Sequence, residues 1–316
     1  MKPILITGAC GFIGFHVAKT CLDCGYSVKG LDNLNDYYDQ ILKKRRLEIL
    51  KKYKNFNFYH KNLASLDGIK DEISIAINFA AQAGVRLPKI QHYKYEESNI
   101  KGFKFFLDFC DKMKINHVIY ASSSSVYSGL SSIPYREEIN LKQPTSKYAQ
   151  TKISNEFMAS EFAKKNDRKV IGLRFFTVYG PWGRPDMAYY QFTKKIVNNE
   201  EITLFNNGQL SRDMTYIEDI VRGVMSSIDY VRSTTSNHEI FNLGNEKPIK
   251  TVDLLKLIQD KFNKNAYIKH IENSNEVKIT CADITKAKIA LGYQPTTEFH
   301  SGMSSFFNWF KSYYEI

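Results

Sequence analysis

The sequence predicts an α/β protein with a doubly wound parallel sheet and a smaller C-terminal α/β lobe. Over about the first 176 of the 316 residues, short apolar runs alternate with helical stretches, as they do in βαβ units. After Gly180-Pro181-Trp182-Gly183 this rhythm breaks into mixed short elements. We therefore expect one domain over residues 1–176 and a second lobe over residues 177–316, with some segments of the second returning to the first.

The apolar runs have the length and composition of buried strands, and longer helical stretches lie between them. The predicted strands, in order, are Ile4–Thr7, Val28–Asp32, Phe56–His60, Ala76–Ala80, His117–Ser122 and Val170–Phe175. The predicted helices are Phe12–Cys24, Asp39–Lys52, Asn99–Lys114 and Lys147–Lys165. Strands that alternate with helices in this way predict crossover connections and a parallel sheet.

The composition is that of an ordinary globular protein, with 43% hydrophobic and 24% charged residues. The formal net charge of +11 comes from 44 Lys plus Arg against 33 Asp plus Glu. These charges are spread along the chain, apart from a modest cluster at Lys43-Lys44-Arg45-Arg46, and no nucleic-acid-binding motif accompanies them. We expect a solvated basic surface and no nucleic-acid partner.

No segment predicts a membrane or secretory destination. Glycines at positions 8, 11 and 14 interrupt the apolar run near the N-terminus, and no small-residue cleavage site follows it. The longest apolar stretch elsewhere, around Ile73 to Val85, is too short and too polar to span a bilayer. Cys21 and Cys24 form a C-x-x-C pair, but no second Cys or His pair completes a zinc site. We expect a cytoplasmic protein with no metal and no membrane partner.

A glycine-rich turn, Thr7-Gly8-Ala9-Cys10-Gly11-Phe12-Ile13-Gly14, follows the first predicted strand. It opens a helix, so backbone N–H groups and the helix N-terminus would face one pyrophosphate. Asp32 ends the second predicted strand, where a carboxylate hydrogen-bonds the ribose hydroxyls of an adenine dinucleotide and repels a 2′-phosphate. The spacing in this context predicts a Rossmann-type domain that binds NAD rather than NADP.

Tyr148 and Lys152 lie four residues apart in the last predicted helix of the first domain, so both project from one face. A phenol titrates near pH 10, too high for a base at neutral pH. A nearby cation favours the phenolate and moves the pKa toward the working range. A solvated helix face would show the same spacing. The pair therefore indicates a catalytic role only in combination with the glycine turn and Asp32.

Together with these features, the serine-rich segment Ala121-Ser122-Ser123-Ser124-Ser125-Val126-Tyr127 resembles the extended short-chain dehydrogenase/reductase family over nearly the whole chain. Longer strings are similar to its UDP-glucuronate 4-epimerase branch. They are Leu31-Asp32-Asn33-Leu34-Asn35-Asp36-Tyr37-Tyr38-Asp39, Ala80-Ala81-Gln82-Ala83-Gly84-Val85-Arg86, Leu173-Arg174-Phe175-Phe176-Thr177-Val178-Tyr179-Gly180-Pro181-Trp182-Gly183-Arg184-Pro185-Asp186 and Arg212-Asp213-Met214-Thr215-Tyr216-Ile217-Glu218-Asp219.

The resemblance implies a nucleotide-sugar epimerase with tightly bound NAD that is regenerated in each turnover. Tyr148 would be the acid/base, Lys152 would hold the nicotinamide ribose and lower the Tyr148 pKa, and Ser123 would share the substrate proton. The implied cofactor-binding residues are Gly8, Gly11, Phe12, Ile13, Gly14, Asp32, Asn33, Asn62, Leu63, Ala80, Ala81, Gln82, Asn99, Tyr148 and Lys152. The family further suggests a homodimer formed through the helices over residues 99–114 and around Tyr148.

The same resemblance places a UDP-sugar in the second lobe. The implied substrate residues are Ser123, Ser124, Ser125, Arg86, Thr177, Arg184, Phe205 and Arg212. A 4-keto glucuronate is a β-keto acid, which loses CO₂ when its scissile bond lies perpendicular to the carbonyl plane, so the carboxylate must be held away from that alignment. The resemblance places Ser124, Ser125 and Thr177 around the carboxylate, with Arg184 helping to fix the ring and the active-site geometry. Related dehydratases and decarboxylases carry a Glu where Ser125 stands, which favours simple epimerisation here.

Other interpretations stay open at this stage. Arg184 could order a surface loop, Ser124 and Ser125 could satisfy the backbone at a strand end, and Arg86 could pair with a neighbouring acid instead of the substrate. The alternative activities are a UDP-glucose or UDP-N-acetylhexosamine 4-epimerase and a UDP-glucuronate decarboxylase. A non-catalytic NAD-binding protein is a further alternative, and the presence of Ser123, Tyr148 and Lys152 together argues against it.

Three positions depart from the family pattern. Asn62 stands in place of the usual acid near the adenine, and Ser128 replaces a Gly after Val126-Tyr127. Asn273 stands where relatives that act on neutral sugars often carry an Arg. None of the three touches the set of Ser123, Tyr148 and Lys152.

Overall fold

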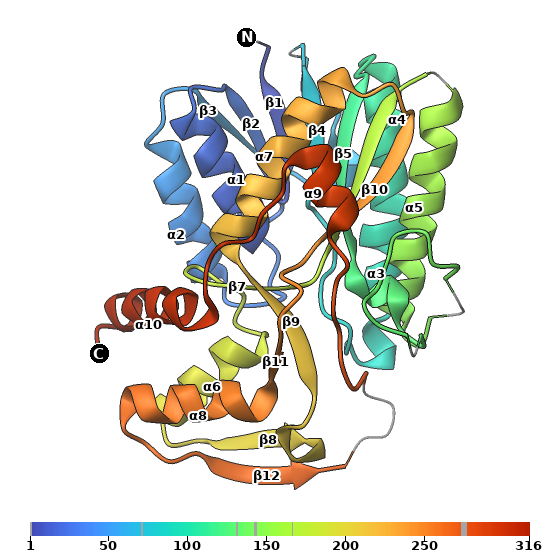
Figure 1. Cartoon of the computed structure of the whole chain (residues 1–316). Helices are drawn as coiled ribbons and strands as arrows, with labels where there is room; N and C mark the ends of the chain where they lie inside the picture. Colours follow the sequence, from blue (N-terminus) through green and yellow to red (C-terminus); the bar gives the residue numbers. More distant parts are fainter. Residues whose placement is uncertain (1, 71, 131, 142–143, 166, 273–276) are drawn as a thin grey trace.

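A seven-stranded parallel sheet forms the core of the larger domain (Figure 1). The computed structural model describes residues 2–70, 72–130, 132–141, 144–165, 167–272 and 277–316. The strands are β1 (Ile4–Thr7), β2 (Val28–Asp32), β3 (Phe56–His60), β4 (Ile75–Asn78), β5 (His117–Ser123), β6 (Lys169–Phe175) and β10 (His238–Leu243), in the spatial order β10-β6-β5-β4-β1-β2-β3. The fold is therefore the doubly wound α/β class that the sequence predicts.

Helices cover both faces of this sheet (Figure 1). One face carries α1 (Phe12–Asp23), α2 (Gln40–Lys51) and α7 (Ile217–Ser233), and the other carries α4 (Gly102–Lys112) and α5 (Lys147–Lys165). Alternate residues of β1 consequently enter different apolar clusters: Ile4 and Ile6 pack in the cluster that contains the α1 side chains, whereas Leu5 packs in the cluster of α4 and α5. Because helices cover both faces, every residue of the central strands β1 and β4 is buried, whereas the edge strand β3 is partly exposed.

The strand order reverses between β1 and β4, because β2 and β3 follow on one side of β1 and β5 and β6 follow on the other side of β4. The loops after these two strands leave in opposite directions and open a crevice at the carboxyl ends of the strands. Topology alone therefore places the ligand site there.

Most predicted elements are confirmed, and a few boundaries are corrected. The strand predicted over Ala76–Ala80 ends at Asn78, because the Thr7 hydroxyl binds Asn78 Oδ1 at 2.6 Å and the backbone then turns past Gly8. Ser123 belongs to β5 rather than to the following loop. The helix predicted over residues 99–114 is divided into a π-helical segment, Glu96–Lys101, and α4.

In the part of the chain that the structure describes, the smaller lobe contains two short sheets and the helices α6 (Ala188–Val197), α8 (Thr251–Phe262) and α10 (Phe299–Tyr314). Its strands are β7 (Thr177–Tyr179), β9 (Ser211–Tyr216) and β11 (Pro248–Lys250) in one sheet, and β8 (Glu201–Phe205) and β12 (Tyr267–Ile271) in the other. β10 and α7 lie with the larger sheet, together with α9 (Thr285–Leu291), which packs on α7. The boundary after residue 176 stays a prediction.

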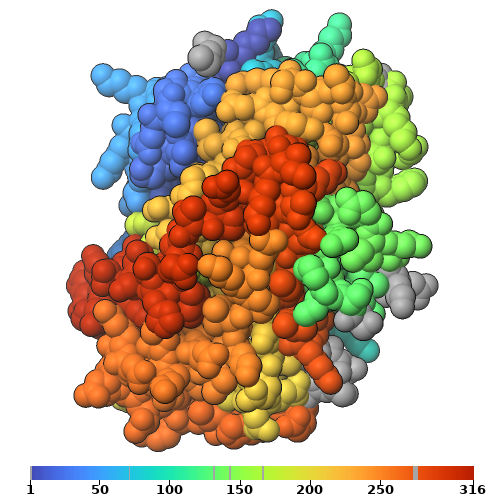
Figure 2. Space-filling model, in the orientation of Figure 1, coloured from blue at the N-terminus to red at the C-terminus, as the bar shows by residue number. Residues whose placement is uncertain are grey.

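The remaining short elements are α3 (Tyr93–Tyr95) and helical turns at Leu63–Ser65, Lys89–Gln91, Ser124–Tyr127 and Asn206–Gly208. In the space-filling view the C-terminal residues, coloured red, cross the visible face between the larger domain above and the smaller lobe below (Figure 2). Among the described residues, no helix combines the length and apolarity needed to cross a membrane.

The basic cluster on α2 corrects the expectation of a wholly solvated surface. Lys43 is 5% exposed and Arg46 is fully buried, because both lie on the helix face that also carries Leu42, Leu47 and Leu50. Arg46 donates to the backbone oxygens of Cys10 at 2.9 Å and Gly183 at 3.1 Å, and also to that of Trp182. A guanidinium with this many acceptors can be buried, and here it ties the glycine turn to the loop after β7.

Helix α1 approaches the glycine turn so closely that Gly14 cannot carry a side chain. A Cβ at Gly14 would lie 2.1 Å from the Gly8 carbonyl oxygen, whereas a Cβ at Gly11 would lie 3.0 Å from it. We expect Gly14→Ala to lower the free energy of unfolding by about 2–3 kcal/mol, because the helix must shift to admit the methyl group. Thermal unfolding measures the change. Gly11→Ala is the graded control and should cost less; an equal loss in both variants would contradict the steric explanation.

Candidate active site

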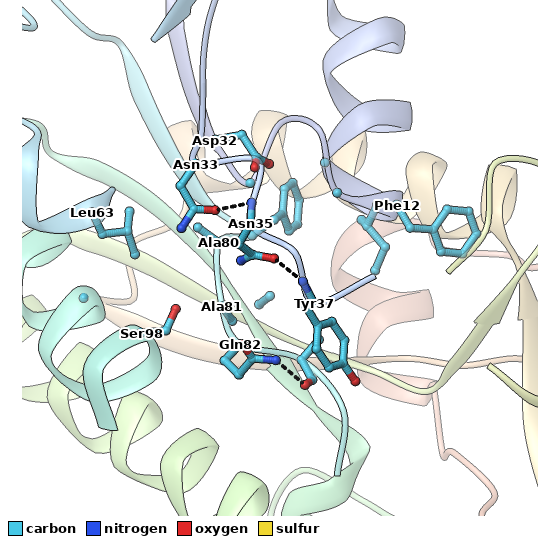
Figure 3. Close-up of a pocket in the computed structure, with 18 of the residues that line it drawn as sticks. Phe12, Asp32, Asn33, Asn35, Tyr37, Leu63, Ala80, Ala81, Gln82 and Ser98 are labelled. Carbon is cyan, nitrogen blue, oxygen red and sulfur yellow. Dashed lines mark hydrogen bonds between the residues drawn. The ribbon is translucent and has the colours of Figure 1, made fainter. Parts of the chain in front are cut away.

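A cavity of about 640 Å³ opens at the carboxyl ends of the central strands. It begins at the glycine turn, passes the ends of β2, β4 and β5, and reaches the first turns of α5 and the segment after β7. Figure 3 shows the part between the ends of β2 and β4, where Asp32 and Asn33 lie across from Ala80, Ala81 and Gln82. One cavity therefore joins the dinucleotide residues and the catalytic residues that the sequence predicts.

The glycine turn forms one wall of the cavity. Gly8, Gly11, Phe12, Ile13 and Gly14 all line it, at the N-terminus of α1. Gly8 has a φ of +70°, and a Cβ there would lie 2.7 Å from the Ala80 backbone nitrogen. The turn thus offers a side-chain-free cradle at a helix N-terminus, which suits a diphosphate.

Asp32 is held so that its carboxylate faces the cavity. Its oxygens accept hydrogen bonds from the backbone N–H groups of Cys10 at 2.9 Å and Leu34 at 2.8 Å. Each carboxylate oxygen has a second lone pair, which can receive a ribose hydroxyl. Beyond it the Asn33 amide donates to Asn62 Oδ1 at 2.6 Å, so the asparagine that departs from the family pattern is held in place.

Leu63, Ala80, Ala81 and Gln82 line the same cavity. Asn99, which the sequence places among the cofactor residues, does not line it. Its side chain is buried and binds the Gln82 backbone twice, accepting from N–H at 2.7 Å and donating to the carbonyl at 3.1 Å. Asn99 therefore holds the loop after β4 in place without lining the cavity itself.

Tyr148, Lys152 and Ser123 meet at the opposite end of the cavity. The Lys152 ammonium lies 5.8 Å from the centre of the Tyr148 ring and donates to the Ala121 carbonyl at 2.8 Å. Ser123 hydrogen-bonds the Tyr148 phenol, and its Oγ also accepts from the Ser125 N–H at 3.2 Å. A hydroxyl that touches a phenol in this way can pass a proton between it and a bound alcohol.

The pKa values of this pair differ from the sequence expectation. Burial raises the pKa of Tyr148, while Arg184 and the hydrogen bond from Ser123 act in the lowering direction. Burial also lowers the pKa of Lys152 to about 8, against the raising effect of Glu156. Arg184 is the cation whose charge lowers the Tyr148 pKa in the protein chain by itself, and the effect of Lys152 on that pKa stays a prediction.

Arg184 is held by one acid, Asp186, which in turn binds the Tyr37 phenol. It donates to Asp186 through Nε at 3.0 Å and Nη2 at 2.5 Å, and Asp186 also accepts from the Tyr37 hydroxyl at 3.0 Å. Burial would raise the pKa of Asp186, but the charge and hydrogen bonds of Arg184 hold it below its usual range. Arg184 lines the cavity and acts on the Tyr148 pKa, so its pairing with Asp186 of the same loop holds it at the site rather than on the open surface.

The other predicted substrate residues lie outside the residues that line this cavity. Ser124 and Ser125 form the turn after β5, and Thr177 begins β7. The Arg86 guanidinium lies over the Phe205 ring at 4.9 Å, which brings the loop after β4 to the end of β8. The Arg212 Nη1 donates to the backbone oxygens of Ser211 and Val277. The roles of these residues stay predictions, and Asn273 lies outside the described residues.

Sequence reasoning gave no site role to Lys43 and Tyr37, which line the cavity, or to Asp186, which holds Arg184 there. Lys43 donates to the Asn35 carbonyl at 2.8 Å and to its Oδ1 at 2.7 Å, and thereby supports the loop after Asp32. A helical-wheel pattern, in which Lys43 and Arg46 share the apolar face of α2, could have identified the buried lysine. No sequence signal joins Tyr37 to Asp186, which is 149 positions away.

Comparison with known proteins supports this geometry. Residues 4–244 match the model of the NAD dependent epimerase/dehydratase family. An uncharacterized protein of Methanocaldococcus jannaschii is 43% identical over 98% of this chain and 96% of its own. The UDP-glucuronate 4-epimerase of Thermodesulfobacterium geofontis is 36% identical over 100% of this chain and 98% of its own. The crystal structure of UDP-glucuronic acid 4-epimerase from Bacillus cereus, in complex with UDP-glucuronic acid and NAD, superposes with a TM-score of 0.90 at 31% identity, over 99% of this chain and 100% of that one.

Proposed function

The chain belongs to the NAD-dependent epimerase/dehydratase family, and from this premise we propose that it interconverts UDP-glucuronate and UDP-galacturonate by epimerisation at C4 of the sugar. At the coarser level it is a nucleotide-sugar 4-epimerase that works with NAD. The observation that carries the proposal is the meeting of Tyr148, Ser123, Lys152 and Arg184 in one cavity with the glycine cradle.

The cavity fits an adenine dinucleotide. Side chains are excluded from its wall at Gly8, where a diphosphate needs backbone contact, and the Asp32 carboxylate keeps lone pairs for ribose hydroxyls. When bound there, NAD supplies a hydride acceptor that returns the hydride, so epimerisation involves no net redox change. The negative charge of Asp32 also opposes a 2′-phosphate, which supports NAD over NADP.

The chain's own residues provide the proton chemistry. Tyr148 takes the proton of the sugar 4-hydroxyl as hydride leaves C4, and it gives the proton back when hydride returns to the other face. Ser123 hydrogen-bonds the phenol and would bind the same sugar oxygen. Lys152, fixed by the Ala121 carbonyl, would hold a ribose hydroxyl and keep positive charge beside the phenol.

The uronate specificity rests on Arg184 and on the turn after β5. A cation held in the cavity wall attracts the sugar carboxylate, and no acid stands at position 125 to assist elimination or CO₂ loss. The Ser125 hydroxyl is buried without a hydrogen-bond partner among the described residues, but Ser125 does not line the cavity, so its contact with the carboxylate stays a prediction. These features favour epimerisation over decarboxylation.

One observation favours a second candidate, a 4-epimerase of UDP-glucose or a UDP-N-acetylhexosamine. The Nε and Nη2 edge of Arg184 is occupied by Asp186, whose negative charge would oppose a nearby sugar carboxylate. A neutral sugar would avoid that repulsion.

Incubation of the purified protein with UDP-glucuronate, UDP-glucose and UDP-N-acetylglucosamine separately decides between the two candidates. We expect the sugar protons of UDP-glucuronate to equilibrate with those of UDP-galacturonate in NMR spectra, and the neutral sugars to react far more slowly. Equilibration of the neutral sugars alone would overturn the uronate assignment, and UDP-pentose with CO₂ as the main products would indicate a decarboxylase.

A further inference from the structure

A buried ion pair packs against the candidate active site. Glu156 follows Lys152 by four residues on α5, so the two side chains share one face of the helix. The Glu156 carboxylate accepts two parallel hydrogen bonds from Arg174 on β6, each of 2.8 Å. The Arg174 and Glu156 side chains are only 3% and 8% exposed. Loss of one partner would therefore leave the other charge buried.

The pair also connects the elements that present the catalytic groups. The Ser122 hydroxyl donates to Glu156 at 2.6 Å, and the next residue on β5 is Ser123. In the sheet Ser122 lies directly opposite Arg174. Glu156 consequently links α5, which carries Tyr148 and Lys152, to β5, which carries Ser123.

The charge of Glu156 reaches Lys152. Burial lowers the pKa of Lys152 to about 8, and Glu156 is the group that acts in the opposite direction. The other groups that face the ammonium are the Tyr148 ring and the Ala121 carbonyl on β5. Arg184 and Asp186 act on the phenol instead. Among the described residues, Glu156 is thus the acid whose charge favours the protonated form of Lys152, one helical turn away on α5.

The remaining titratable neighbours face the carboxylate rather than the ammonium. They are Tyr120 on β5 and His238 on β10, both of which feel the charge of Glu156. Burial lowers the pKa of His238 to about 4, so the histidine is neutral in the physiological range. It cannot replace Arg174 as the partner of the carboxylate.

We propose that Glu156 is a positioning residue whose buried charge keeps Lys152 protonated and in place, with Arg174 neutralising that charge toward the core. The inference deepens the proposed 4-epimerase function, and it applies to whichever UDP-sugar the enzyme accepts. Without the carboxylate, the pKa of Lys152 falls further, so the ammonium loses its proton at a lower pH. The unpaired Arg174 guanidinium adds to this shift, because a like charge disfavours the charged form.

The variant Glu156→Gln tests the proposal through the pH profile of kcat/KM, recorded with the UDP-sugar that the wild-type enzyme turns over. We expect the decline of kcat/KM at alkaline pH to begin about one pH unit lower than in the wild type, because Lys152 loses its proton earlier. This decline is the alkaline limb of the profile. We also expect a lower Tm, because Arg174 is left buried without its partner. Glu161→Gln removes the same charge from an exposed position of α5, where the side chain is 56% exposed, and should leave both unchanged. An unmoved alkaline limb in Glu156→Gln refutes the electrostatic role.

The double variant Glu156→Leu with Arg174→Met separates that role from simple packing. Replacing a buried ion pair by apolar side chains is often nearly neutral for stability, so we expect the Tm to recover toward the wild-type value. The alkaline limb should stay displaced, though by less than in Glu156→Gln, because Lys152 still lacks the carboxylate while the unpaired guanidinium is gone. A double variant with a wild-type limb overturns the proposal, and this test stands even if Glu156→Gln does not fold. A wild-type protein that turns over no UDP-sugar refutes the proposed function instead.

Discussion

The variant Tyr148→Phe is expected to lose about 10³-fold in kcat while it stays folded and retains NAD. The substitution deletes one oxygen from a ring that packs against Tyr95 at 5.9 Å, so the packing survives. What disappears is the group that hydrogen-bonds Ser123 and exchanges the proton of the sugar 4-hydroxyl. NMR of the sugar protons measures turnover, and chromatography of the nucleotide released on denaturation measures bound NAD.

Tyr95→Phe is the matched control, because it makes the same chemical change beside the site. The Tyr95 hydroxyl donates to the Gly84 carbonyl and so supports the loop after β4, away from the proton-transfer groups. We expect its kcat to stay within about tenfold of the wild-type value. Equal losses in the two variants, or loss of bound NAD from Tyr148→Phe, would show that the phenol has a structural role and that the base lies elsewhere.

The features that could be predicted from the sequence are those that neighbouring residues determine. The glycine turn, the carboxylate at the end of β2 and the i, i+4 relation of Tyr148 to Lys152 each lie within one strand, turn or helix. Local spacing therefore identified the residues, and it also placed the first three strands at their observed bounds. Their proximity in one cavity follows from the parallel sheet, in which the carboxyl ends of strands meet at one edge.

Features that depend on distant residues could not be predicted. The pKa of Tyr148 responds to burial, Arg184, Ser123 and Asp186, and the spacing to Lys152 predicts none of these effects. The Arg46 contacts reach residues 136 and 137 positions away, so composition alone made that arginine resemble a surface charge. Glu156 has its partner 18 residues away on an adjacent strand. In each case a charge was visible in the sequence, but its burial and partner were set by tertiary packing.

Arg184→Ala is expected to let UDP-glucuronate decarboxylate, so that UDP-pentose and CO₂ appear while epimerisation slows at least tenfold. The guanidinium is held in the cavity wall by Asp186, beside the phenol that would act on C4. If it orients the sugar carboxylate, its loss frees the scissile bond of the 4-keto sugar to turn perpendicular to the carbonyl plane. NMR of the sugar protons and trapping of CO₂ measure the partition between the two products.

The same substitution also leaves the Asp186 carboxylate with Tyr37 as its hydrogen-bond donor, and Asp186 acts to raise the pKa of Tyr148. A slower reaction could therefore arise from a poorer base alone. The double variant Arg184→Ala with Asp186→Ala removes the orphaned carboxylate and resolves the two causes. Persistent UDP-pentose in the double variant assigns the guanidinium to the substrate carboxylate. Epimerisation that recovers, without any UDP-pentose in either variant, would assign Arg184 to the electrostatics of Tyr148 and remove its support for a uronate substrate.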